Sequence, residues 1–574
     1  MDLEHGINWD RPVATYIKKL DDFTLVGYRF SKGWAPDQRL WFAIKTNKPI
    51  SDLKLFDSTK EVQGTELTSI KVKAVLSLGN KGGEVLYKVG LSPVSYEGAL
   101  NNIQMELPGW DFEKARKDAR NAWDKQLSVV NYNTADPDRK TVFYTAMYHA
   151  MIQPSLSNDF DKSYRGTDKK VYEKASFNNY TVFSLWDTYR TLHPLMTILQ
   201  PNRESDFINS LLAIYQQQGF LPIWPLMGGE TYCMIGYPAV PVIADAILKD
   251  FKGFDVNLAY EAMKKTANQD TFGINYLKNL GYIPADKENE SVAKAMEYAI
   301  SDYSIAKVAQ KLGKEDDYQY YLKRSQLYRQ YFDKTVGFVR GKMSDGSWRT
   351  PFDPFEAKHR ENDYTEGNAW QYTWLVPQDP YGLIALFGDD KAFTDKLDSL
   401  FNAKGSLGPN ASPDISGLIG MYSQGNEPNH HTPYLYAYAG QQWKTAEKIR
   451  QIDREFFTSK PDGLCGNDDC GQMSAWYVMS ALGFYPVNTA DGNFVFGSPL
   501  MTKATIKVDK NKTFTVVAEN NNSKNIYIQS VVLNGKPYTK TYISYKEIMA
   551  GGTLKFIMGA QPNKKFGVNK ADRP

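Results

Sequence analysis

Glu366 has neighbours that could make its carboxyl group a general acid. It lies in the segment Tyr364–Tyr372, beside Gly367 and among three aromatic residues. Apolar surroundings disfavour a charged carboxylate and raise its pKa, which is what a general acid needs at neutral pH. A position in the first turn of a helix would instead lower the pKa through the helix dipole. The sequence leaves both environments open.

Two adjacent carboxyl groups, Asp468 and Asp469, stand just before a predicted helix in the segment Gly466–Trp476. The NH groups at a helix N-terminus favour an ionised carboxylate, so either residue could act as a general base. The alternative is a simple acidic N-cap, which is common in helices. Cys465 and Cys470 flank the pair, and we expect both thiols to be reduced.

One protonated and one ionised carboxyl group would divide the acid and base roles between two segments. Glycoside hydrolysis uses two carboxyl groups in this way. The hypothesis requires Glu366 and Asp469 to meet in space, although they are far apart in the chain. A phosphorylase is less well supported, because the segment around Asp469 has no Lys or Arg to bind phosphate.

Two more segments carry groups that suit a cation or a sugar. Asn426 and Glu427 lie in a polar run before a predicted helix. Their hard oxygen donors suit calcium, which takes about six to eight oxygen ligands; a polar loop without a metal is the alternative. One turn of helix would place Asp187 and Arg190, next to Trp186, on one side as a sugar clamp or as a local ion pair.

The composition excludes several classes of protein. The 574 residues carry 68 Lys and Arg against 65 Asp and Glu, so the net charge of +3 indicates no nucleic-acid-binding face. Three Cys and six His exclude a disulfide scaffold and make a Cys- or His-based zinc centre improbable. No run of 18 apolar residues predicts a membrane span, and Met1–Arg11 has no apolar signal-peptide stretch.

The order of hydrophobic patterns predicts a multidomain protein of α and β structure. Short aromatic and branched runs from residue 23 predict a partial N-terminal β-sandwich in residues 1–107. A charged helical linker follows in residues 108–135. About ten or more helices joined by long loops then favour a helical toroid in residues 136–490 over a four-helix bundle. Alternating runs and Asn534-Gly535 predict a small C-terminal β region in residues 491–574.

Several of these motifs occur in the order found in one known family. The chain resembles glycoside hydrolase family 92, the calcium-dependent exo-acting α-mannosidases of bacteria. The likeness covers the chain from about residue 24 to the C-terminus. It rests on the segments Gly27–Trp34, Leu185–Arg190, Glu297–Ala299 with Asp302, Glu366–Tyr372, Ser416–Gly420, Gly425–Pro428 and Gly466–Ser474.

The resemblance implies a fold, a reaction and roles for three carboxyl groups. The family has an N-terminal β-sandwich and an (α/α)6 toroid, and it inverts the anomeric carbon. By resemblance, Glu366 is the general acid. Asp469, with help from Asp468, is the base that activates water. The two carboxyl groups of an inverting pair should stand about 6.5–9.5 Å apart.

The resemblance also implies a metal and a substrate. The family binds Ca2+, which contacts the terminal mannose of a mannose-containing glycan. Asn426 and Glu427 would contribute to the calcium site, one of them through a backbone carbonyl. Trp186 and Asp187 would contact the terminal mannose.

The sequence departs from the family in two respects. Only 26 residues precede Gly27, so we expect part of the sandwich to be missing. A second chain could supply it, or the gene could be split or truncated. The alternative is a non-catalytic or complex-dependent mannoside-binding protein. Gly408–Pro413 stands where α-1,2-specific members have a His-Pro-Glu segment, which leaves the linkage open. Relatives act in the periplasm or at the cell surface, although no export signal is recognised here.

Overall fold

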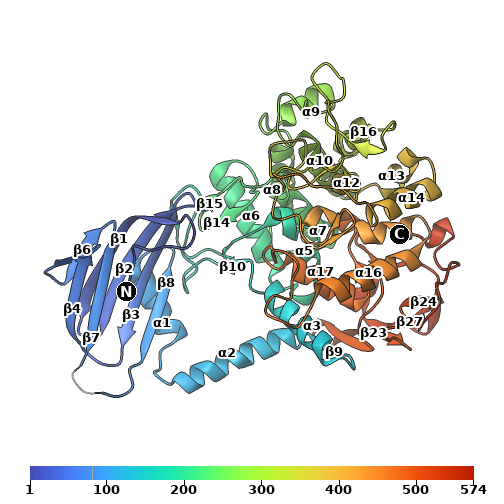
Figure 1. The fold of residues 1–574 in the computed structure, drawn as a ribbon. Coiled ribbons are helices and arrows are strands. Elements are labelled where there is room, and N and C mark those ends of the chain that lie inside the picture. Colours follow the sequence, from blue (N-terminus) through green and yellow to red (C-terminus); the bar gives the residue numbers. More distant parts are fainter. Residues whose placement is uncertain (80–81) are drawn as a thin grey trace. The chain divides into compact units, whose positions relative to one another are not determined.

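A computed structural model describes residues 1–79 and 82–574 of the chain. These residues form two compact units, each assembled from separate stretches of the sequence (Figure 1). The division into four consecutive domains remains a prediction, because the two units are defined by their compactness and each combines separate stretches of the chain. Unit 1 comprises Met1–Gln126, Pro154–Phe183 and Asp206–Cys233, and unit 2 comprises Leu127–Gln153, Ser184–Ser205 and Met234–Pro574.

Unit 1 contains a β-sandwich. A five-stranded antiparallel sheet has the order β6-β1-β2-β3-β8, and a three-stranded sheet has the order β5-β4-β7. Ile17, Leu25 and Phe42 of the larger sheet pack in one core with Leu55 and Val72 of the smaller sheet. The strands are β1 Arg11–Asp21, β2 Thr24–Lys32, β3 Gln38–Thr46, β4 Ile50–Asp57, β5 Lys60–Val62, β6 Glu66–Ser69, β7 Val72–Leu78 and β8 Tyr87–Ser92.

The predicted sandwich is confirmed, but its start was predicted too late. Strand β1 lies before residue 23 and pairs with β2 along its length. The Arg, Thr and Lys residues of β1 make this segment look polar in the sequence, so it was not predicted as a strand. Thr15 and Ile17 are nevertheless fully buried. With β1 included, this chain itself forms both sheets. The prediction of a second chain that supplies part of the sandwich therefore finds no support.

Two helices follow the last strand of the sandwich. Helix α1 (Tyr96–Glu106) occupies part of the region predicted as β, and Ser95 caps it by accepting a hydrogen bond from Gly98 N. Its Ala99 and Ile103 pack on Val26 and Ala43, on the face of the larger sheet that points away from the smaller one. Helix α2 (Phe112–Leu127) matches the predicted helical linker and has no buried residue.

Unit 2 is mostly helical, as predicted. Asp136 caps α3 through hydrogen bonds from Asp138 N and Arg139 N, with Pro137 as the first helical residue. The arrangement as six helix pairs remains a prediction. The helices within unit 2 are α3 Pro137–Ala150, α4 Leu185–Thr188, α5 Leu192–Leu199, α7 Ala239–Leu248, α8 Val256–Ala267, α9 Ile274–Leu280, α10 Ser291–Lys311, α11 Glu315–Ser325, α12 Ala369–Tyr372, α13 Pro380–Phe387, α14 Asp390–Leu400, α15 Leu435–Tyr438, α16 Gln442–Phe456, α17 Gln472–Leu482 and α18 Tyr545–Ala550, whereas α6 Glu204–Gln218 lies mostly in unit 1.

The C-terminal β region forms a six-stranded sheet in the order β25-β24-β27-β23-β22-β9, in which β9 is light blue and β23, β24 and β27 are orange to red in Figure 1. Asn534 and Gly535 both have positive φ, 51° and 79°, and make the predicted hairpin turn. The edge strand β9 comes from the end of the predicted linker. In the described part of the chain, no helix is long and apolar enough to cross a membrane. The strands are β9 Val130–Asn133, β22 Lys503–Asp509, β23 Lys512–Glu519, β24 Tyr527–Leu533, β25 Lys536–Tyr538 and β27 Gly552–Gly559.

Candidate active site

The side chain of Asn426 joins two of the predicted site segments. Its Nδ2 donates a hydrogen bond of 2.8 Å to the backbone carbonyl of Glu366. Its Oδ1 accepts a hydrogen bond of 3.0 Å from the backbone N–H of Glu427. Asn426 therefore fixes the backbone that carries Glu366 against the backbone that carries Glu427.

Gln472, the first residue of α17, joins the other two segments. Its Oε1 accepts hydrogen bonds of 3.1 Å from the N–H groups of Thr191 and Leu192, directly after the Asp187 segment. Its Nε2 lies 3.1 Å from Nδ1 of His430, at the end of the Glu427 segment. The four segments thus converge in unit 2, as the two-carboxyl hypothesis requires, and the separation of about 6.5–9.5 Å between the Glu366 and Asp469 carboxyl groups stays a prediction.

Small residues allow two of these segments to touch through their backbones. A Cβ placed on Gly466 would lie 3.0 Å from the Cα of Gly425. A Cβ placed on Gly425 would lie 2.0 Å from Oγ of Ser416. Neither position has room for a side chain, which explains why the motifs around Glu427 and Asp469 both contain glycine.

Asp187, Glu427 and Asp469 form a tight cluster of carboxyl groups. One oxygen from each lies within 4.8 Å of the others. Burial raises the pKa of Asp187 and of Glu427 well above the ordinary value, and the neighbouring carboxylate charges raise both further. Burial and the charges of Asp414 and Asp468 raise the pKa of Asp469 to about 7. If all three carboxyl groups were ionised, they would repel one another in this buried cluster.

Arg190 does not form the predicted ion pair with Asp187. Its Nη2 lies 2.5 Å from Oε1 of Glu297, and the two side chains are buried. Asp187 instead accepts a hydrogen bond from the Ser184 hydroxyl. The guanidinium of Arg190 lies 5.0 Å from the centre of the Trp186 ring. Asp187 therefore keeps a carboxyl oxygen that no guanidinium occupies.

Glu366 is in the environment that a general acid needs. Burial raises its pKa to about 8, and the negative charges of Asp414 and Asp469 add to this effect. The helix-dipole alternative does not apply, because Asn368 caps α12 and Glu366 stands before that cap. At neutral pH the carboxyl group of Glu366 therefore carries a proton.

The two adjacent aspartates differ in their contacts. Oδ1 of Asp468 accepts hydrogen bonds from the N–H and the hydroxyl of Ser474, at 3.1 Å and 2.5 Å. Asp468 therefore accepts hydrogen bonds in the first turn of α17, a role that the sequence left open for either aspartate. Asp469 makes no such contact, and its pKa shift runs opposite to the helix-dipole expectation. A cation held by the cluster would favour its ionised form.

Both candidate catalytic residues have left-handed backbone conformations. Glu366 has a φ of 47°, Asp469 a φ of 42°, and the following Cys470 a φ of 58°. Such angles cost of order 1–3 kcal/mol for a residue with a side chain and concentrate at functional sites. The sequence gives no signal for this feature. Cys465 and Cys470 are free thiols, in agreement with the expectation.

The donor set fits a hard cation such as calcium. Oδ1 of Asp187, Oε1 of Glu427 and Oδ1 of Asn429 are buried and accept no hydrogen bond from the described residues. The side chain of Asn426 is hydrogen-bonded at both ends, so its predicted contact to calcium stays a prediction for the backbone carbonyl. Sequence reasoning missed Asn429, although it lies in the same polar run as Glu427.

Sequence reasoning also missed Asp414, whose charge acts on both Glu366 and Asp469. Its Oδ2 accepts a hydrogen bond of 2.6 Å from the Ser412 hydroxyl, which lies 3.0 Å from Nδ1 of His359. That same His359 nitrogen lies 3.9 Å from Oε1 of Glu366. Asp414 is a single acidic residue in a long loop, and no spacing in the sequence marks it.

We expect Asp414→Asn to move the pH–activity profile to lower pH. Burial raises the pKa of Glu366 to about 8 and that of Asp469 to about 7, and the negative charge of Asp414 adds to both shifts. Its removal lowers both pKa values, so the acid loses its proton and the base gains one at lower pH than before. Profiles of kcat/KM for the two proteins measure the shift. An unchanged alkaline limb would show that Asp414 does not act on Glu366.

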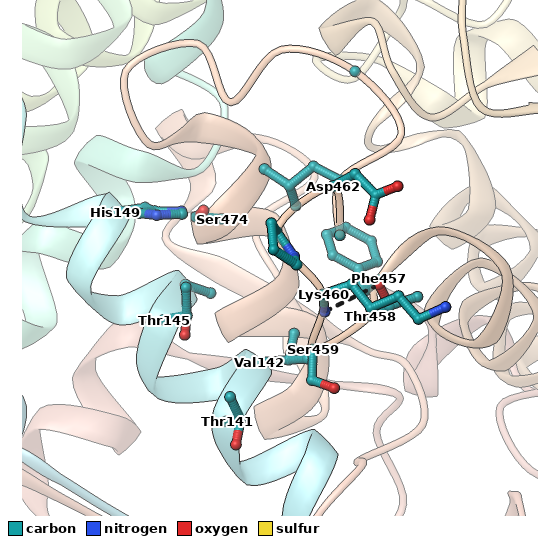
Figure 2. A pocket seen from close by; sticks show the side chains of 15 residues that line it. Thr141, Val142, Thr145, His149, Phe457, Thr458, Ser459, Lys460, Asp462 and Ser474 are labelled. Atoms are coloured by element: carbon teal, nitrogen blue, oxygen red, sulfur yellow. Dashed lines mark hydrogen bonds between the residues drawn. The ribbon is translucent and has the colours of Figure 1, made fainter.

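A cavity of about 470 Å³ lies beside the segment that carries the two aspartates (Figure 2). Thr141, Thr145 and His149 of α3 line one side, and residues 457–464 line the other. None of the clustered carboxyl groups lines it. It reaches the segment only at Gly466 and at Ser474, whose hydroxyl supports Asp468.

The four segments converge in the helical unit, and the chain also contains a β-sandwich. Their buried carboxyl groups include a protonated one and a cluster that could hold a cation. This combination is typical of a glycoside hydrolase that works with two carboxyl groups. Sequence comparison agrees. A family model described as "Glycosyl hydrolase family 92 catalytic domain" matches residues 98–560. A second model, described as "Glycosyl hydrolase family 92 N-terminal domain", matches residues 1–92. The chain belongs to glycosyl hydrolase family 92.

Solved structures and a curated protein show the same likeness. The family GH92 α-mannosidase BT3965 from Bacteroides thetaiotaomicron, in complex with mannoimidazole, is 40% identical with a TM-score of 0.96, over 100% of this chain and 77% of its own. The inverting mannosidase BT2199 from the same organism is 30% identical with a TM-score of 0.90, over 100% and 79%. An uncharacterised secreted glycosidase of Arthroderma benhamiae is 28% identical over 89% of this chain, which spans 66% of its length.

Proposed function

We propose that this protein is an inverting exo-α-mannosidase, which releases terminal mannose from the α-mannosides of glycans. The observation that carries the proposal is the convergence of Glu366, Asp469, Asp187 and Glu427 in one family 92 catalytic domain. The α-mannosidases among the similar structures, one of them described as inverting, support the substrate and the stereochemistry. Release of free mannose from α- but not β-mannosides is the direct test.

Glu366 is the proposed general acid. Its proton, retained because burial raises the pKa to about 8, passes to the glycosidic oxygen as the bond to the anomeric carbon breaks. Asp469 is the proposed base and removes a proton from the water that attacks the opposite face. Asp468, fixed by Ser474, holds the turn on which Asp469 stands.

Trp186 and Asp187 are the proposed contacts to the terminal mannose. The indole Nε1 of Trp186 is buried and has no hydrogen-bond acceptor among the described residues. Asp187 Oδ1 is likewise buried without a donor. Sugar hydroxyls can accept from the indole and donate to the carboxylate, which would satisfy both groups.

Calcium is the proposed cofactor. Glu427 would hold it through Oε1, with Oδ1 of Asn429 and, by the family resemblance, the backbone carbonyl of Asn426 as further oxygen donors. Asp187 would add negative charge beside the ion. When bound, such a cation polarises sugar hydroxyls and stabilises neighbouring negative charge. The surplus of buried carboxylates in this cluster supports the assignment, because a carboxylate pair without a counter-charge is costly.

We expect activity to fall at least tenfold when a chelator removes calcium, and to return when calcium is added back. Glu427→Gln keeps the shape of the site but removes a charged ligand, so it should weaken calcium activation by about 10–100-fold. Glu361→Gln, at an exposed residue before the Glu366 segment, serves as the control and should behave as the unmodified protein. Full activity of the chelated enzyme would contradict the metal assignment.

Two finer points are part of the proposal. Action outside the cytoplasm is supported by the secreted glycosidase among the relatives. Action on N-glycans or similar mannosides, in a bacterium, is supported by the family resemblance and by the similar structures from Bacteroides thetaiotaomicron. The linkage is not part of it. The alternative of a non-catalytic mannoside-binding protein has no support, because the acid, the base and the cation-binding carboxyl groups are all present.

A further inference from the structure

The loop that carries Glu366 closes on itself. The backbone N–H of Glu366 donates a hydrogen bond of 2.9 Å to the carbonyl of His359. Lys358 and Gly367, the residues on either side, pair as an isolated antiparallel β-bridge. Residues 359–366, here called the acid loop, are therefore joined at their base, and the proposed general acid stands at one of the two ends. A shift of the acid loop would move the carboxyl group of Glu366 with it.

One glutamate from outside the acid loop contacts it at three places. Glu290 directly precedes α10, and its Oε1 accepts a hydrogen bond of 2.8 Å from Oγ1 of Thr365, the residue before Glu366. Arg360, near the other end of the loop, donates to both carboxylate oxygens, through Nε at 2.8 Å and Nη2 at 2.9 Å. The backbone N–H of Glu290 donates a hydrogen bond of 2.7 Å to the carbonyl of Asn362. Glu290 thus ties both ends of the acid loop to the start of α10.

The bonds between Glu290 and the acid loop are buried and directional. An Arg–carboxylate pair with two hydrogen bonds fixes orientation as well as distance. Glu290 is 4% exposed and Thr365 is 0% exposed, so water does not readily replace these bonds. Loss of the partners would leave a buried carboxylate unsatisfied, which keeps the acid loop in place. The side chain of Arg360 is 32% exposed, so water can solvate its guanidinium when Glu290 is changed.

The backbone conformations at both sides of this contact need outside support. Glu290 has a φ of 60° and Glu366 a φ of 47°, both in the left-handed region. For a residue with a side chain, such angles persist only where the surrounding structure holds them. The hydrogen bonds of Glu290 to Thr365 and Arg360 supply part of that support. They act on the residue next to Glu366, where the direction of its side chain is set.

We propose that Glu290 is a positioning residue for the general acid, and that it holds the acid loop so that the carboxyl group of Glu366 meets the glycosidic oxygen. The inference rests on the proposed function, since it concerns the proton transfer of that reaction. Both side-chain oxygens of Glu290 bind the acid loop rather than the cluster of Asp187, Glu427 and Asp469. Its role is therefore to place one group, not to bind sugar or cation.

The test is Glu290→Gln in the full chain, assayed on two substrates. An alkyl α-mannoside needs the proton of Glu366, whereas a dinitrophenyl mannoside has an activated leaving group and does not. We expect kcat on the alkyl mannoside to fall about 10–100-fold, because a shift of a catalytic group by about 1 Å can have an effect of this size. The rate on the dinitrophenyl mannoside should change less than about threefold. Equal losses on both substrates, or no loss on either, would overturn the proposal.

A charge effect of Glu290 must be separated from a positional one. Besides burial and the charges of Asp414 and Asp469, the charge of Glu290 raises the pKa of Glu366, and the charge of Arg360 lowers it. Loss of the Glu290 charge therefore moves the alkaline limb of the pH profile to lower pH. We compare kcat at the pH where each variant is most active on the alkyl mannoside. A loss that disappears under this comparison would mean a charge effect only and would overturn the positioning role.

Thr365→Val removes one of the hydrogen bonds without a change of charge. It should cause a smaller loss than Glu290→Gln, again on the alkyl mannoside alone. If Glu290→Gln does not fold, this variant decides the question, and an unchanged alkyl rate or equal losses on both substrates would overturn the proposal. Glu288→Gln is the matched control, because Glu288 pairs with Lys294 rather than with the acid loop, and both of its rates should stay unchanged.

A double variant shows whether Glu290 acts through the acid. Glu290→Gln added to Glu366→Gln should cause no further loss on the alkyl mannoside, because the group that Glu290 positions is already absent. A further loss of tenfold would place its effect elsewhere and overturn the proposal. Failure of the proposed function looks different, since the unmodified protein would then release no mannose from either substrate. An active unmodified protein with equal losses in Glu290→Gln would overturn the positioning role alone.

Discussion

Glu366→Gln lowers the turnover of an alkyl α-mannoside by about 10²–10⁴-fold, the usual contribution of a general acid. Glutamine keeps the shape of the side chain but has no acidic proton to give to the leaving oxygen. A substrate with an activated leaving group, such as a dinitrophenyl mannoside, needs no such proton and should retain most of its rate. Initial rates on the two substrates measure the contrast.

Two controls make this result specific to Glu366. Glu361→Gln changes a nearby exposed glutamate and should leave both rates unchanged. An unchanged Tm shows that Glu366→Gln is folded. Equal losses on both substrates, or full activity on the alkyl mannoside, would remove Glu366 from the acid role.

Asp469→Asn lowers turnover by about 10²–10⁴-fold on both kinds of substrate. The attacking water must lose a proton whichever group leaves, so an activated leaving group does not rescue the base variant. The same pair of substrates therefore separates the base from the acid.

Asp468→Asn tests the division of roles between the adjacent aspartates. It weakens the hydrogen bonds from Ser474 and should cause a smaller loss, because Asp468 supports the turn rather than the water. Asp462→Asn, at an exposed residue of the preceding loop, is the control and should remain fully active. A larger loss in Asp468→Asn than in Asp469→Asn would reverse the assignment.

Much of the fold could be predicted from local patterns. Asp136-Pro137 marked the start of α3, and Asn534-Gly535 marked the hairpin between β24 and β25. Strand β1 escaped prediction because its exposed face is polar and its apolar residues are few. Helix α1 was not predicted because it has only 11 residues and begins directly after the short turn that follows β8.

The site was predictable where a residue type alone carried the chemistry. Glu366 among aromatic residues indicated a raised pKa, which the burial of the segment explains. Arg190 pairs with Glu297 rather than with Asp187, a long-range contact that local spacing cannot reveal. The side chain of Asn426 binds the backbone of Glu366, so the predicted calcium contact of Asn426 stays a prediction for its backbone carbonyl. Asp414 and Asn429 depend wholly on folding for their place in the site.

The measurement that tests the central claim most directly is proton NMR of the first mannose released from an α-mannoside. Water that attacks the face opposite the leaving group, with Asp469 as base and Glu366 as acid, produces β-mannose first and α-mannose only later by mutarotation. The account predicts early β-anomer signals that precede the α-anomer. Initial release of α-mannose would mean retention of configuration, and would contradict the proposed pair of carboxyl groups.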